Sequence, residues 1–161
     1  MKLSTLLSFG AIAGLVAVNS ASAQTATQTV TFQVTAINQI AVTGSPSLVI
    51  NSAVAGTAPT AVTASGNTWS VTTNQTGASI TASIPTAMPA GLTLSANLSA
   101  PSGATSTGLT ALGTTAVNVV TGITKLNAAA LGLSYQLDAT AAAGVVSSAT
   151  RVVTYTITGG V

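Results

Sequence analysis

Hydrophobic and polar residues alternate with a period of two along most of this chain. In the first such run, Val30, Phe32 and Val34 alternate with threonine and glutamine. Successive side chains of a strand point to opposite faces, so this alternation is typical of a strand with one buried face and one solvated face. Further runs of the same kind lie at residues 69–73, 80–84, 92–98, 131–137 and 153–157.

Clusters of glycine, proline, asparagine and serine separate these runs and predict turns between them. Two shorter apolar stretches, 48–50 and 117–120, add candidate strands. The alanine-rich stretches 128–131 and 139–143 have room for a helical turn but not for a lasting helix. The sequence therefore predicts one all-β domain, an antiparallel β-sandwich of about eight or nine strands.

Residues 1–23 have the pattern of a secretory signal peptide. Lys2 supplies the positive start, residues 3–18 the apolar run, and Ala21-Ser22-Ala23 the cleavage site. A transmembrane anchor fits less well, because serine and glycine interrupt the run and no basic cluster follows it. We therefore expect a secreted, cell-surface protein with residues 24–161 as its single domain and no integral membrane segment after cleavage.

Ionisable side chains are almost absent after this leader. Only Lys125, Asp138 and Arg151 remain, and the chain has no histidine, cysteine or glutamate. Acid–base, nucleophilic and metal catalysis each need several such groups within reach of one another. We therefore expect that the protein is not an enzyme and has no catalytic, cofactor-binding or metal-binding residues. Calcium usually takes more than one carboxylate, so Asp138 is expected to be solvated or paired with Arg151 or Lys125.

The net charge of the chain after the leader is small, since Lys125 and Arg151 oppose Asp138 and leave +1. Phosphate binding needs several cations on one face, so nucleic acid is not an expected partner. Copies with so little charge hardly repel one another, and this permits association. Without cysteine, packing and backbone hydrogen bonds must provide the stability of the exported domain.

Four aromatic residues follow the leader: Phe32, Trp69, Tyr135 and Tyr155. Exposed aromatic rings can stack on sugars, which makes Trp69, Tyr135 and Tyr155 candidate contacts for an extracellular polysaccharide. Each of the four, however, is in phase with aliphatic neighbours on its own strand, and this favours a place in the core.

Residues 24–37 suggest a more specific hypothesis. A polar start leads directly into an alternating strand at the beginning of the mature chain, with Val30, Phe32, Val34 and Ala36 as its apolar row. Such a strand can add to the sheet of a neighbouring copy, and head-to-tail addition builds a filament. The alternative is that residues 24–37 form the first strand of a closed sandwich.

Three stretches of the chain resemble a group of small exported bacterial proteins rich in threonine, alanine and valine. These stretches are 29–34 (TVTFQV), 117–123 (VNVVTGI) and 141–158 (AAAGVVSSATRVVTYTIT). The group ends in a similar Arg-x-Val-Thr-Tyr-Thr strand and has no assigned activity, so the resemblance implies export and a β fold.

More loosely, the layout is similar to that of immunoglobulin-like subunits of bacterial surface filaments, of the fimbrial or biofilm-matrix type. This resemblance implies an immunoglobulin-like sandwich that polymerises by donated strands. The chain departs from chaperone–usher pilins, which usually have tyrosine where this chain has Gly160 and often carry a cysteine pair. Our expectation is a structural subunit whose partners are copies of itself. The alternative is a monomeric binding module for polysaccharide or another extracellular ligand.

Overall fold

The computed structural model describes residues 22–161, so most of the predicted signal peptide lies outside the described residues. Residues 34–161 form one compact unit, and residues 22–33 belong to another and are described by themselves. The strand predicted at 24–37 is not formed in the single chain, where the first assigned strand is β1, Asn38–Thr43. A strand requires a hydrogen-bonded partner as well as an alternating sequence.

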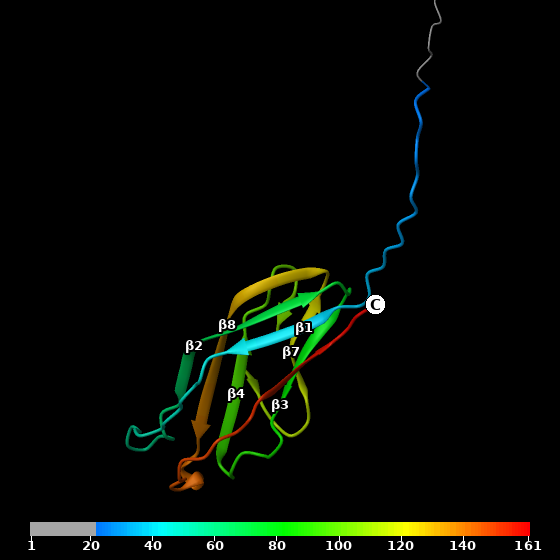
Figure 1. Ribbon diagram of the computed structural model, residues 1–161. Coiled ribbons are helices and arrows are strands. Elements are labelled where there is room, and N and C mark those ends of the chain that lie inside the picture. The colour runs from blue at the N-terminus through cyan, green and yellow to red at the C-terminus, as the bar shows by residue number, and fades with distance from the viewer. Residues whose placement is uncertain (1–21) are drawn as a thin grey trace, which may run out of the picture. The chain divides into compact units, whose positions relative to one another are not determined.

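Two antiparallel sheets make up the compact unit, which confirms the predicted all-β sandwich (Figure 1). The larger sheet has the order β1-β2-β8-β4-β6 and the smaller one β5-β7-β3-β9. The strands after β1 are β2 Val62–Thr73, β3 Ala78–Ser83, β4 Leu92–Leu98, β5 Thr105–Ser106, β6 Thr110–Ala111, β7 Val117–Ile123, β8 Leu126–Ala139 and β9 Thr154–Thr158.

The alternation in the sequence appears directly as alternation in burial. Along β3, Ala78, Ile80 and Ala82 are fully buried, whereas the serine and threonine between them are only partly covered. The second half of β2 follows the same rule, with Trp69 and Val71 inside. The inward residues of both sheets meet in one core, whose largest fully buried side chains are Trp69, Ile80, Ile84, Leu98, Ile123, Val119 and Val120.

Four local predictions differ in outcome. The stretch 117–120 is part of β7, whereas 48–50 forms no strand in the described chain. The stretch 139–143 holds a short 3₁₀ turn, Ala141–Ala143. A helical turn at 128–131 was wrong: these residues belong to β8, because β2 pairs with β8 along this stretch and supplies its backbone partners. Among residues 22–161, no helix has the length and apolar character needed to cross a membrane.

The buried core should dominate the stability of the domain. We expect Ile80→Ala to lower the free energy of unfolding by about 2–5 kcal/mol, because it removes buried methylene groups and leaves a cavity. Val54 is exposed, so Val54→Ala serves as the control and should change stability by less than about 0.5 kcal/mol. Urea unfolding of the protein spanning residues 24–161 measures both; equal effects at the two sites would contradict the assignment of the core.

Candidate functional site

The apolar row predicted in the N-terminal segment is exposed. The exposed fractions are 72% for Val30, 89% for Phe32 and 79% for Val34, and Ala36 is exposed as well. Phe32 was expected in the core with the other aromatics, but in the single chain its ring is almost fully accessible. Solvent exposure of so many large apolar side chains in one short segment is unfavourable, so this segment is a candidate for contact with another molecule.

Asn74 holds the chain at the point where the compact unit begins. Its side-chain oxygen accepts a hydrogen bond from the Ile37 amide at 2.8 Å, and its side-chain nitrogen donates to the Thr35 carbonyl at 2.7 Å. The Asn74 amide also donates to the Ile37 carbonyl at 3.2 Å. These three bonds keep the backbone extended from Thr35 into β1.

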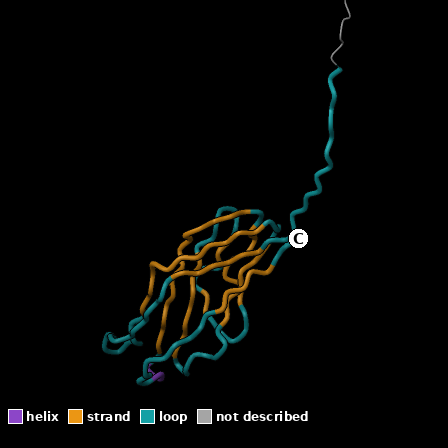
Figure 2. Tube along the Cα trace, in the orientation of Figure 1, coloured by secondary structure: helices purple, strands orange, loops and turns teal. Residues whose placement is uncertain are grey.

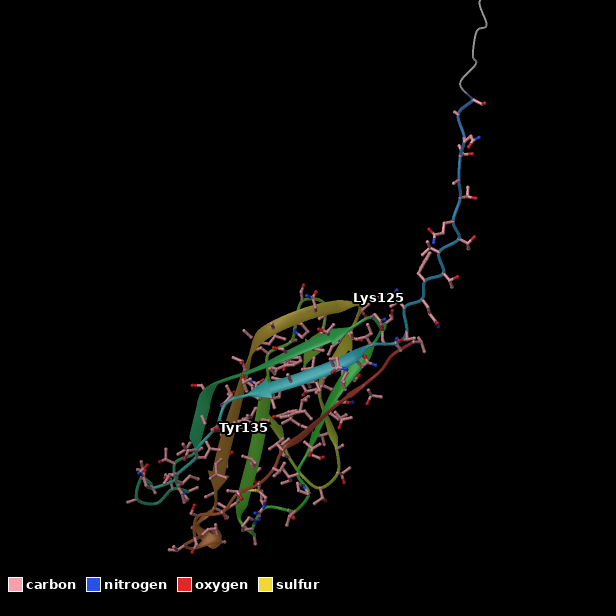
Figure 3. All side chains as sticks on the ribbon, viewed as in Figure 1. Lys125 and Tyr135 are labelled. Atoms are coloured by element: carbon pink, nitrogen blue, oxygen red, sulfur yellow. The ribbon has the colours of Figure 1, made fainter. Side chains whose placement is uncertain are left out.

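The C-terminus is anchored next to Asn74. The backbones of Val161 and Thr76 exchange two hydrogen bonds, at 3.0 and 3.1 Å. Gly160 is required there, because any side chain would collide with the Thr76 carbonyl oxygen. Lys125 lies at the same end of the sandwich, in the turn between β7 and β8 (Figure 3), and its amide donates to the Gln75 carbonyl at 2.9 Å.

One side of the sandwich is closed by a segment that passes from one sheet to the other. Residues 105–111 pair first with β7, as β5, and then with β4, as β6. The Thr107 amide donates to the Val119 carbonyl at 3.1 Å, and the Leu112 amide to the Leu94 carbonyl at 2.8 Å. Leu112 is buried and covers the core from this side. We call this the closed side.

The opposite side, where β1 and β9 are the edge strands, has no such closure within the described chain. The two edges are neighbours, since a side chain at Gly159 would touch the Asn38 amide group. However, β1 pairs with β2 and β9 pairs with β3, and the two are not joined to each other. Figure 2 draws the chain after β1 and the chain before β9 as loop. We call this the open side.

The aromatic ligand-contact candidates lie in or beside the core. Trp69 is 1% exposed, Tyr135 is buried and Tyr155 is partly buried. The Tyr155 hydroxyl donates to the Tyr135 hydroxyl at 2.9 Å, which joins β9 of one sheet to β8 of the other. Burial raises the pKa of both phenols above the ordinary value of 10.0. Their mutual hydrogen bond partly offsets this rise for Tyr135 and adds to it for Tyr155.

The charged side chains do not gather into a site. The two carboxylate oxygens of Asp138 each accept a hydrogen bond at 3.1 Å from the side-chain amide nitrogen of Gln136. Asp138 is therefore not paired with Arg151 or Lys125, which was one of the two arrangements expected for it. Arg151 instead donates to the carbonyls of Thr150 and Ala87, at 2.9 and 3.2 Å. Among residues 22–161 no three potential metal-ligating side chains come together.

An open hollow of about 500 Å³ lies beside the Asn74 anchor. It is lined by Ile37, Thr72, Thr73, Asn74, Lys125, Leu126 and Asn127. Within this lining Lys125 is the one charged side chain, and no acid or base faces it. The hollow can therefore accept a short polar or apolar segment but has no groups for chemistry.

Two parts of the site were not found from the sequence. The role of Asn74 is one of them, because its contacts with Thr35 and Ile37 span more than thirty residues. The open side depends on which strands pair, and alternation carries no information on pairing. By contrast, the exposed row of Val30, Phe32 and Val34 is the row that the sequence singled out.

Comparisons with models of protein families, with curated proteins and with solved structures found no match. The resemblances to exported bacterial proteins and to filament subunits therefore remain predictions, and the argument for function rests on this chain alone.

The two tyrosines should behave as one coupled unit. Removing one hydroxyl leaves the other without its partner, so Tyr135→Phe and Tyr155→Phe should each destabilise the protein by about 0.5–1.5 kcal/mol. In the double variant no orphaned hydroxyl remains, so its loss should be smaller than the sum of the two single losses. Urea unfolding of the four proteins measures the coupling. Additive losses would mean that the hydroxyls do not interact.

The same pair predicts the pH dependence of stability. A raised folded-state pKa means that the unfolded state releases the phenolic protons first, so stability is intact below about pH 10 and falls above it. Between about pH 5 and pH 9 few groups titrate, and the thermal midpoint should move by less than about ten degrees. The double phenylalanine variant should show a weaker fall above pH 10. A decline of the same steepness in both proteins would exclude the tyrosines as its cause.

Proposed function

We propose that this protein is an exported structural subunit of the cell surface that is not an enzyme. In this proposal it self-assembles into filaments, as fimbrial and biofilm-matrix subunits do, by donating its N-terminal strand. The donor strand is residues 24–37. Residues 28–36 are the part that carries Val30, Phe32, Val34 and Ala36 as the inserted row. The observation that carries the proposal is the exposure of this alternating apolar row.

The chemistry of the segment favours donation to another copy over folding back. Residues 24–37 contain no glycine, proline, asparagine or aspartate, which are the residues that form tight turns. Most of the segment is threonine, valine and glutamine, and β-branched residues disfavour the positive φ that hairpin turns require. The Asn74 bonds to Thr35 and Ile37 also fix the backbone where a reversal would begin.

Burial of the row would provide the energy of association. Transfer of one Val or Phe side chain from water to an apolar site contributes about 1.5–3 kcal/mol. Burial of Val30, Phe32 and Val34 and the backbone hydrogen bonds of an added strand both oppose the cost of association. No charged residue lies between Gln24 and Ile37 to oppose this burial.

The small number of charged side chains supports a role without catalysis. The charged residues Lys125, Asp138 and Arg151 are each engaged with different neighbours or exposed, and they do not converge. Export rests on the pattern of residues 1–23. The competing proposal, a sugar-binding module, loses support because Trp69 and Tyr135 are buried and offer no stacking surface.

Electron microscopy tests the proposal directly. We expect protein spanning residues 24–161 to form regular filaments, and protein that begins at Ala36 to remain dispersed because it lacks the donor row. Urea unfolding of the shorter protein must show an unchanged domain. Dispersed particles from the full mature protein at all concentrations would contradict self-assembly, and filaments from both proteins would contradict strand donation.

A further inference from the structure

We infer that the open side of a second copy receives the donated strand, between the chain that follows β1 and the chain that precedes β9. The two receiving segments are residues 44–51 and 145–153. This inference rests on the proposed function and specifies the part of it that the sequence left undefined: the surface that accepts residues 28–36.

Unpaired backbone is concentrated on this side. β1 covers β2 only from Thr68 to Thr73, so the edge of β2 from Val62 to Asn67 has no strand beside it on that flank. Residues 145–153 run into β9 without strand pairing in the described chain. Amide and carbonyl groups on such edges are the groups that an added strand would bind.

Apolar side chains accompany this free backbone. Val49 is 64% exposed and Val152 is 68% exposed, whereas Leu48 and Val153 are partly buried against the core. Both receiving segments thus combine a side chain that packs on the core with one that is accessible. An incoming apolar row would find apolar contacts on each of them.

The charges of the two surfaces match the same occupant. Neither receiving segment has a charged side chain except Arg151, and its guanidinium already donates to the carbonyls of Thr150 and Ala87. An uncharged, alternating strand therefore meets an edge whose one charged side chain already has hydrogen-bond partners, and this chain supplies both.

The closed side is a poor acceptor by the same criteria. Residues 105–111 already pair with the middle of the β4 edge, at Ser95 and Ala96, and with the β7 edge at Val120 and Thr121, and the buried Leu112 follows them. Leu109 is nevertheless 50% exposed. It therefore provides a matched control position, with an apolar side chain that is accessible but lies away from the proposed joint.

Because the chain has no cysteine, introduced thiols report contacts without background. We propose three double variants of the protein spanning residues 24–161. Each combines Thr31→Cys in the donor strand with Val49→Cys, with Val152→Cys or with Leu109→Cys. After treatment with a short bifunctional maleimide, a chain with one thiol stops at dimers. A chain with two thiols forms a ladder of longer oligomers only where donor and acceptor positions of different copies meet.

The expected result is a ladder for the two open-side variants, with several-fold more trimer and longer species than the Leu109→Cys variant gives. A ladder from the Leu109→Cys variant alone would overturn the open side as acceptor and leave strand donation intact. Filaments in the microscope without a ladder from any variant would overturn strand donation itself. Circular dichroism of each variant, compared with the unsubstituted protein, confirms that the domain is folded before cross-linking.

Discussion

Backbone hydrogen bonding is the constraint on which this structure depends. A sandwich without disulfides, with few charges and with many threonines is held together by its strand pairing and by the core that the pairing brings together. On the closed side, residues 105–111 pair with both sheets and connect them. On the open side and in the N-terminal segment, the chain has extended backbone that its own sheets do not use. The proposed assembly would pair these two stretches of unpaired backbone, one from each of two copies.

Because charged residues are scarce, the unpaired edges are not protected against association with another copy. Sandwich proteins usually protect their edges with lysine, proline or inward-pointing charges, which prevent edge-to-edge association. Neither β1 nor β9 contains a charged residue or a proline. The side chains of residues 24–161 sum to a net charge of +1, so copies of this part of the chain approach one another with little repulsion. Features that would make a monomer prone to aggregate are useful in a subunit, provided that one register of association is preferred.

Much of the fold could be predicted from alternation alone, because a strand with one buried face repeats every two residues. Trp69, Ile80 and Tyr135 are in the core where their phase placed them. Phe32 has the same phase and is exposed, since alternation indicates which face of a strand is apolar but not which molecule covers it. The 128–131 stretch is a strand although alanine favours helices, because β2 beside it overrides local propensity. Strand order and the Asn74 contacts join residues far apart in sequence, and no local pattern contains them.

The backbone that leads into β1 is anchored at one end of the sandwich. Asn74 fixes the backbone from Thr35 to Ile37, and the Val161–Thr76 pairing secures the C-terminus at the same end of the sandwich. A donor strand on a fixed base loses less conformational freedom on binding than one on a loose linker, because the direction of its first residues is already set. The glycine at position 160, where a pilin would have tyrosine, allows the C-terminal backbone to approach Thr76 closely. The C-terminal residues therefore lie beside the Asn74 contacts that fix the backbone from Thr35 into β1.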